Sequence, residues 1–118
     1  MTSKPLIAAI LVAGLSVTAA VAVAGPAVDE QAGKAIYDAQ CMICHGQDGA
    51  GTGPAGGALN PKPNDFTAAA WWTDRTDDAI MSAIRSGSPG TSMKGYNKLT
   101  REKLQNLIAY LHTFQPAK

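Results

Sequence analysis

The segment from Gly46 to Phe66 places the strongest restriction on how this chain can fold. Its sequence is GQDGAGTGPAGGALNPKPNDF, which holds six of the twelve glycines and three of the seven prolines of the 118-residue chain. Glycine and proline at this density exclude a regular helix. A loop of this length is uncommon in a compact domain unless it serves a function or is disordered. We therefore expect something other than side chains to fill the centre of the domain.

Three other segments have the pattern of helices. The first, residues 29–40, opens with two acidic residues, which suit the positive end of a helix. The second has Thr76 as its N-cap and Gly87 as a left-handed residue at its end. The third follows the cap Thr100 and has the clearest apolar stripe. The stripe consists of Leu104, Leu107, Ile108 and Leu111, with Tyr110 and Phe114 beside it.

The fold class follows from these three helices. No run of residues alternates with period two for long enough to predict a strand, so we expect an all-α fold. Three short helices bury too little apolar area to be stable alone, and a domain of this size usually needs a staple, a metal or a cofactor.

The first 24 residues have the pattern of a secretory signal peptide. A single positive charge at Lys4 precedes nineteen uncharged residues, which end in the small-residue triplet Ala22-Val23-Ala24. We therefore predict cleavage after Ala24 and a mature domain of residues 25–118. An uncleaved anchor is the alternative, because about 20 apolar residues span a bilayer. Both interpretations predict an exported, periplasmic domain, with membrane contact only if the segment is retained.

The charges of the chain nearly cancel, with a formal net charge of +1 at pH 7. This balance argues against a dedicated nucleic-acid-binding protein. The sign nevertheless changes along the sequence. Residues 29–78 contain eight acidic and three basic side chains, whereas residues 79–118 contain six basic and one acidic. We expect the folded protein to carry a charge dipole.

The run Cys41-Met42-Ile43-Cys44-His45 indicates the cofactor. Two intervening residues let both thiols reach the two vinyl groups on one edge of a haem, and the adjacent imidazole then ligates the iron. A thioredoxin-like redox pair or a structural disulfide would leave His45 without a role. A zinc site would need His112, the other histidine, as its fourth ligand. We predict one covalent haem c, attached through Cys41 and Cys44.

The sixth iron ligand is predicted to be a methionine thioether. Met42 lies within the attachment motif, on the His45 side of the ring, and Met81 falls on an apolar helix face where methionine commonly fills the core. Met93 lies in an irregular segment before the last helix and can reach the iron from the other face. His112 is simpler to interpret as a surface residue near a helix end. The segment around Met93 also resembles the ligand loop of class I cytochrome c, in which a methionine precedes an aromatic residue by a few positions. This resemblance, together with the residues, makes His45 and Met93 the predicted metal ligands.

These motifs resemble those of class I cytochrome c, and the similarity covers nearly all of residues 25–118. The family has a small and an aromatic residue on its N-terminal helix, which Gly33 and Tyr37 match, and its last helix crosses there. Leu107 and Tyr110 match the packing positions on that last helix. The resemblance implies a small cytochrome c fold. Three to five helices would pack around one covalent haem, with the N- and C-terminal helices crossing.

The resemblance also implies secondary contacts. Pro54 is the nearest match to a proline whose carbonyl accepts the proton of the ligand imidazole. Trp71 or Trp72 matches a tryptophan that donates to a haem propionate, and two adjacent tryptophans are equally consistent with packing alone. Tyr96 is expected to cover the haem edge near Met93.

Such a site predicts electron transfer, because histidine and methionine together leave the iron no open position for a substrate. We therefore predict a one-electron carrier, and no enzyme, between periplasmic or membrane-bound redox partners. The alternatives are a small haem enzyme or ligand sensor in which Met93 is labile, and a fixed cytochrome subunit of a larger respiratory complex. Lys94 and Lys98 flank the predicted ligand segment. They form either a basic rim that steers an acidic partner or an ordinary solvated surface.

Overall fold

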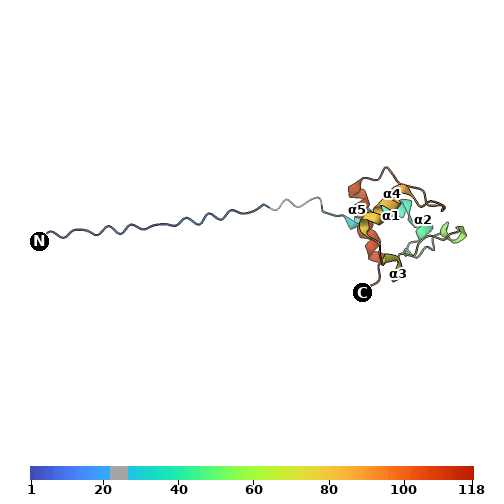
Figure 1. The fold of residues 1–118 in the computed structure, drawn as a ribbon, viewed down its shortest axis with the longest axis horizontal. Coiled ribbons are helices and arrows are strands. Elements are labelled where there is room, and N and C mark those ends of the chain that lie inside the picture. The colour runs from blue at the N-terminus through green and yellow to red at the C-terminus, as the bar shows by residue number, and fades with distance from the viewer. Residues whose placement is uncertain (22–26) are drawn as a thin grey trace.

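The computed structural model describes residues 1–21 and 27–118, and the helices in these residues follow the order that the sequence predicts (Figure 1). No strand occurs in the described residues, so the expected all-α fold is confirmed. The elements are α1 (Glu30–Gln40), α2 (Met42–His45), η1 (Gly56–Ala58), α3 (Ala69–Trp72), α4 (Asp77–Ser86), α5 (Arg101–Leu111) and η2 (His112–Phe114).

The three long helices begin at side chains that cap them. Asp29, Thr76 and Thr100 each accept a hydrogen bond from the backbone N–H three residues later, over 3.0, 3.2 and 3.2 Å. Each bond satisfies a donor that the first turn of a helix leaves free. Gly87 ends α4 with φ of 80° and ψ of 179°, so the predicted positive φ is present, while ψ is extended instead of left-handed helical.

Helices α1 and α5 cross at Gly33, as the resemblance to class I cytochrome c implies. A Cβ atom at Gly33 would lie only 1.8 Å from the backbone oxygen of Asn106, so the two backbones touch directly. The Asn106 side chain also accepts a hydrogen bond of 2.8 Å from the backbone N–H of Asp29. One small residue and one amide side chain therefore fix both the distance and the register of the crossing.

The core lies between α1, α4 and α5. The four residues of the predicted α5 stripe are at most 4% exposed, and Tyr37 and Leu107 are completely buried. The Tyr37 ring lies 5.2 Å from that of Tyr110 and 5.3 Å from that of Phe114, which confirms that both aromatic residues pack beside the stripe. The Tyr37 hydroxyl donates to the Gly46 carbonyl over 2.6 Å and so ties α1 to the residue that follows α2.

The glycine-rich segment folds back onto α2. The backbone N–H groups of Gly51, Gly53 and Ala55 donate to the carbonyls of His45, Cys44 and Ile43, over 2.8 to 3.1 Å. These carbonyl groups belong to a helix of only one turn, so no N–H group within that helix donates to them. A Cβ atom at Gly53 would lie 2.4 Å from the Ile43 oxygen, so this close approach requires glycine. The loop thereby holds α2 in place.

Residues 1–21 have no helix or strand and are exposed, and they extend away from the helical domain in Figure 1. The predicted cleavage position after Ala24 lies outside the described residues. Neither residues 1–21 nor residues 27–118 include a helix with the length and apolar character needed to cross a membrane.

Candidate haem-binding site

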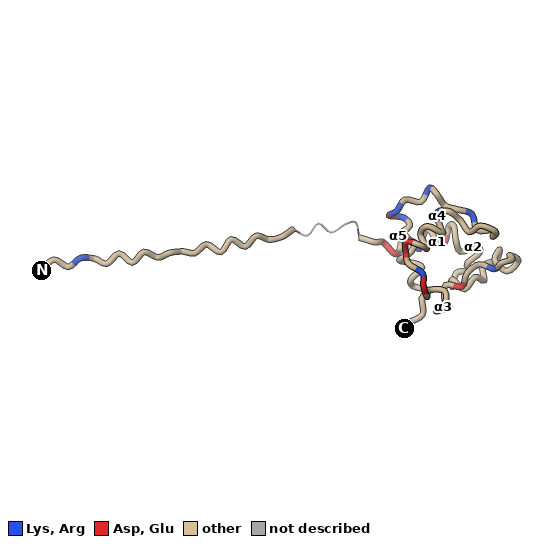
Figure 2. The backbone as a smooth tube through the Cα atoms, in the orientation of Figure 1, with Lys and Arg blue, Asp and Glu red and all other residues tan. Residues whose placement is uncertain are grey.

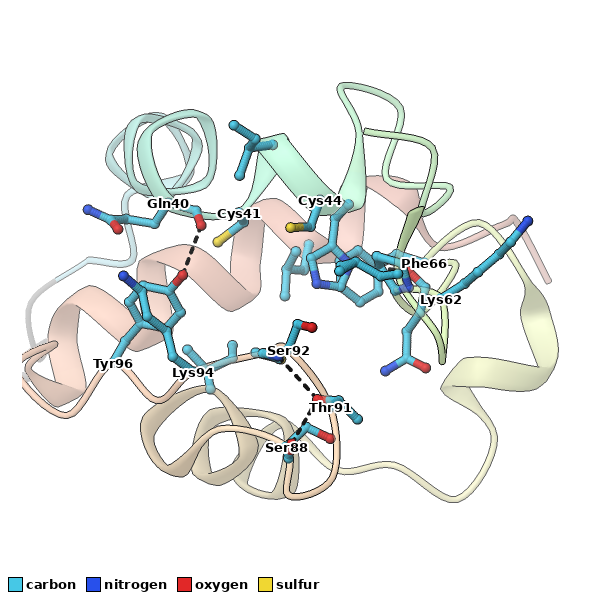
Figure 3. Close-up of a pocket in the computed structure, with 18 of the residues that line it drawn as sticks. Gln40, Cys41, Cys44, Lys62, Phe66, Ser88, Thr91, Ser92, Lys94 and Tyr96 are labelled. Atoms are coloured by element: carbon cyan, nitrogen blue, oxygen red, sulfur yellow. Dashed lines mark hydrogen bonds between the residues drawn. The ribbon is translucent and has the colours of Figure 1, made fainter. Parts of the chain in front are cut away.

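One cavity brings together most of the residues that the sequence singles out. Its volume is about 460 Å³, within the range of about 300 to 1,000 Å³ for cofactor and ligand pockets. Cys41, Cys44, His45, Met93 and Tyr96 all line it, and they come from the α2 end of the domain and from the segment between α4 and α5. Figure 3 labels Cys41, Cys44 and Tyr96 among them.

The two cysteines present free thiols to this cavity. Cys41 links the end of α1 to the start of α2, and Cys44 lies one turn later, so that Figure 3 shows both sulfur atoms side by side at the cavity wall. Burial raises the pKa of the Cys41 thiol to about 12, and the charge of a neighbouring Cys44 thiolate would add to this effect. The Cys41 thiol is therefore protonated at neutral pH and is no ready nucleophile on its own.

The imidazole of His45 is held from two sides. Its Nδ1 atom lies 3.2 Å from the carbonyl oxygen of Asn64, and its ring stacks on Phe66 at 4.5 Å with an interplanar angle of 16°. Burial lowers the pKa of His45, and the Asn64 carbonyl opposes this shift to a smaller extent. A neutral ring that donates from Nδ1 keeps the Nε2 lone pair for a metal, which is the usual arrangement of a ligating histidine.

The acceptor for His45 is not the one that the sequence predicts. Pro54, the expected residue, lies on a different hollow of the surface together with Met42 and Gly46, and the Asn64 carbonyl takes its place. The prediction for Pro54 is therefore wrong. The physical reason is the path of the loop, which bends back along α2 near Pro54 and reaches the histidine ring only ten residues later.

Met93 is the methionine that faces the cavity. All four methionines lie in the described residues, and of these only Met93 lines the cavity. Met81 is 8% exposed and belongs to the core, and Met42 lies on the hollow near Pro54. These positions agree with the reasons for which the sequence analysis set Met42 and Met81 aside.

Hydrogen bonds within the segment hold the Met93 backbone. The Met93 carbonyl accepts from the Ser88 N–H over 3.1 Å, and the Met93 N–H donates to the Thr91 hydroxyl oxygen over 3.2 Å. The Thr91 hydroxyl in turn donates to the Ser88 carbonyl over 2.7 Å. Residues 87–96, which we call the Met93 loop, therefore have a defined shape although they are not helical.

The two adjacent tryptophans have different environments, and neither lines the cavity. The Trp72 Nε1–H donates to the Phe66 carbonyl over 2.8 Å, so Trp72 is a satisfied core residue. The Trp71 Nε1–H is buried and finds no acceptor among the described residues, while the centres of the Trp71 and Phe66 rings lie 4.7 Å apart in a T-shaped arrangement. Of the two indoles, Trp71 is thus the one that still needs an acceptor.

His112 lies at a separate place on the surface. Its Nε2 atom is 2.8 Å from an Asp77 carboxylate oxygen, its Nδ1 atom is 2.9 Å from the Gln115 side-chain oxygen, and its ring stacks on Trp72. In the described parts of the chain, no group of three or more Cys, His, Asp or Glu residues is arranged to hold a metal ion. The geometry therefore does not favour the zinc alternative.

Basic residues, and no acidic ones among those described, line the cavity. Of the two lysines that flank the predicted ligand segment, Lys94 lines the cavity. Lys62 and Asn64 also line it and were not predicted, because nothing in the NPKPND sequence signals that this stretch returns to His45. Lys98 does not line the cavity, but it follows Lys94 along the chain between α4 and α5, where Figure 2 shows several basic positions.

Burial raises the pKa of Tyr96, so its hydroxyl is protonated at neutral pH.

The side chains of this cavity fit a haem. Two thiols lie together on one wall, a neutral imidazole with a free Nε2 follows them directly, and a thioether enters from a separate loop. An all-α domain with crossed terminal helices and this set of donors is a class I monohaem cytochrome c.

Comparison with known proteins identifies the family. A family model described as cytochrome C oxidase, cbb3-type, subunit III, matches residues 28–111. The chain belongs to this family of c-type cytochrome domains. Members of this class carry covalently bound haem and take part in electron transfer.

Two solved structures are similar to this chain. One belongs to the Kuenenia stuttgartiensis reducing HAO-like protein complex Kustc0457/Kustc0458, with 28% sequence identity and a TM-score of 0.68. The match covers 75% of this chain and 45% of that chain, so this protein spans less than half of that relative. The other is the KustC0563 c-type cytochrome, with 31% identity, a TM-score of 0.58, and coverage of 71% of this chain and 98% of that chain.

Proposed function

We propose that this protein is a one-electron carrier with a single haem, attached through Cys41 and Cys44 and ligated by His45 and Met93. The observation that carries the proposal is that these four side chains line one cavity, the histidine with its Nδ1 atom already engaged. The haem supplies the one-electron couple of its iron.

The residues around the cavity favour electron transfer over catalysis. The Asn64 carbonyl and the Phe66 ring hold the His45 imidazole, and the hydrogen bonds of Ser88 and Thr91 hold the Met93 backbone. Two ligands that are held in this way would leave no position for a substrate on the iron. They would also move little between the two oxidation states, which keeps the reorganisation energy low.

A spectrum of the whole protein tests this proposal. The full chain would be produced with its leader in cells that mature c-type cytochromes, and its visible spectrum recorded with and without carbon monoxide. We expect a covalent haem that resists removal by acid and organic solvent, and a ferrous spectrum that carbon monoxide does not change. Colourless protein with two free thiols would refute haem attachment. Ready binding of the gas would instead favour the haem enzyme or ligand sensor.

We also propose that the domain is exported to the periplasm. The support is the pattern of residues 1–24, in which one positive charge precedes an uncharged stretch that ends in small residues. The mass and N-terminal sequence of the same purified protein test this. We expect a chain that begins at Gly25, whereas a chain that retains residues 1–24 and requires detergent would indicate the membrane anchor.

The basic residues at the cavity suggest a redox partner with an acidic surface. Lys62 and Lys94 line the cavity and no described acidic residue does, so an approaching anion meets positive charge at this face. We expect oxidation of the ferrous protein by ferricyanide, a trianion, to slow as salt is added. Oxidation by tris(phenanthroline)cobalt(III), a trication that is a strong enough oxidant for such a haem, is expected to show the opposite trend.

Matched variants locate this effect. Lys62→Gln and Lys94→Gln are each expected to slow the ferricyanide reaction at low salt by roughly twofold or more. Lys118→Gln removes the same charge from an exposed terminal residue outside the cavity and serves as the control. Equal effects of all three substitutions, or rates that do not depend on salt, would contradict local steering.

A second arrangement has support from the comparisons. The similar chain of Kuenenia stuttgartiensis belongs to a complex of two proteins, and this chain matches less than half of its length. The cytochrome domain of this protein could serve in the same way as a fixed subunit instead of a diffusible carrier. The size of the native protein under mild purification distinguishes the two, because a carrier would elute as a single small chain.

A further inference from the structure

One side-chain hydrogen bond connects the Met93 loop to the attachment end of α1. The Tyr96 hydroxyl donates to the backbone carbonyl of Gln40 over 3.0 Å, across 56 residues of sequence, and Figure 3 shows this bond at the edge of the cavity. Gln40 is the last residue of α1 and directly precedes Cys41. The bond therefore joins the segment that carries Met93 to the segment that carries the thiols.

In the part of the chain that the structure describes, this is the only hydrogen bond between the Met93 loop and α1. Within the described residues, the other hydrogen bonds of the Met93 loop stay inside the loop or go to α4 or to the turn before α5, such as the 2.9 Å bond from the Tyr96 N–H to the Ile84 carbonyl. A carbonyl in the last turn of a helix has no partner within that helix. The Tyr96 hydroxyl therefore satisfies the Gln40 carbonyl while it bridges the cavity.

The surroundings of Tyr96 support a role at the cavity and not in the core. Its ring lines the cavity together with Met93, and it is only partly buried. Lys94 places its ammonium group 5.7 Å from the centre of the same ring. The loop backbone is also pressed against α4, because a Cβ atom at Gly95 would lie 2.6 Å from the Arg85 oxygen. One side of the loop is thus fixed by backbone packing, and the side toward α1 by the Tyr96 hydroxyl.

We propose that Tyr96 is a positioning residue whose hydroxyl latches the Met93 loop to the attachment end of α1 and so keeps the thioether of Met93 on the iron. The proposal rests on the ligation proposed above. When the latch opens, the loop is free to swing away from α1, and an external ligand competes with Met93 for the sixth position. The hydroxyl thereby sets how readily the methionine leaves.

Removal of one hydroxyl tests the latch. Tyr96→Phe keeps the ring in the cavity and removes only the hydrogen bond to Gln40. The matched control is Tyr110→Phe, because the Tyr110 ring packs on Tyr37 away from the cavity and its hydroxyl makes no hydrogen bond within the described structure. Imidazole is the probe, and its binding to the ferric protein is followed by the visible spectrum, with urea unfolding measured in parallel by circular dichroism.

We expect Tyr96→Phe to bind imidazole roughly two- to tenfold more tightly than the unmodified protein, the ratio that corresponds to one net hydrogen bond. Tyr110→Phe is expected to bind imidazole as the unmodified protein does. Imidazole affinity of Tyr96→Phe equal to that of the unmodified protein would overturn the latch. Equal increases in both variants, together with equal losses of stability, would also overturn it, because the effect would then be one of general loosening.

A third variant separates failure of the latch from failure of the ligation. If Met93→Ala binds imidazole more tightly than the unmodified protein while Tyr96→Phe does not, the ligation stands and the latch is overturned. If Met93→Ala and the unmodified protein bind imidazole equally, the proposed methionine ligation fails, and the latch fails with it.

Discussion

Alanine at position 33 is expected to destabilise the domain by at least about 2 kcal/mol, although alanine favours a helix by about 1 kcal/mol over glycine. The steric effect decides the sign, because the added Cβ atom would lie 1.8 Å from the Asn106 backbone oxygen. Only movement of α1 away from α5 can relieve this contact, and that movement stretches the hydrogen bond between Asp29 and Asn106. Urea unfolding followed by circular dichroism measures the loss.

A second glycine provides the control for this experiment. Gly57 lies in η1, is exposed, has no positive φ, and has open space where a Cβ atom would be placed. Gly57→Ala is therefore expected to change the free energy of unfolding by no more than about 0.5 kcal/mol. If Gly33→Ala proves as stable as Gly57→Ala, the direct contact of backbones at the crossing is contradicted.

The parts of the fold that depend on local chemistry were predictable from the sequence. A cap such as Thr100 acts on the N–H group three residues later, and the apolar stripe of α5 repeats with the helix period, so neither depends on distant parts of the chain. The crossing at Gly33 was predicted from the resemblance to cytochrome c. Its physical basis is visible only when the Asn106 backbone is placed beside it.

The contacts around the predicted haem ligands, such as the hydrogen-bond acceptor of His45, were not predictable in the same way. The acceptor for His45 is a backbone carbonyl, and every residue has one, so the sequence offers no signal that selects Asn64 over Pro54. The distinction between the two tryptophans has a similar origin. The two tryptophans differ because only the Trp72 indole nitrogen reaches the Phe66 carbonyl. The orientation of the one-turn helix α3 relative to the preceding loop decides which of the two does so.

On the ligation proposed above, replacement of Met93 by alanine is expected to let the protein bind carbon monoxide, which the unmodified protein is expected to exclude. Met93 is the methionine at the cavity, and an alanine side chain cannot reach the iron, so the sixth position is left to water or to an added ligand. The reduction potential is expected to fall, because a thioether ligand favours the ferrous state. Visible spectra with and without the gas and a potentiometric titration measure the two effects.

Met81 supplies the matched comparison, because it is a buried methionine that packs within the core and does not line the cavity. Met81→Leu nearly conserves volume, so it is expected to cost less than about 1.5 kcal/mol of stability and to leave the spectrum and the carbon monoxide response unchanged. Both substitutions remove a thioether, so the loss of a methionine as such cannot explain a difference in their carbon monoxide response. If Met93→Ala kept the unmodified spectrum and excluded the gas, another side chain would have to hold the iron, and the carrier would need a different sixth ligand.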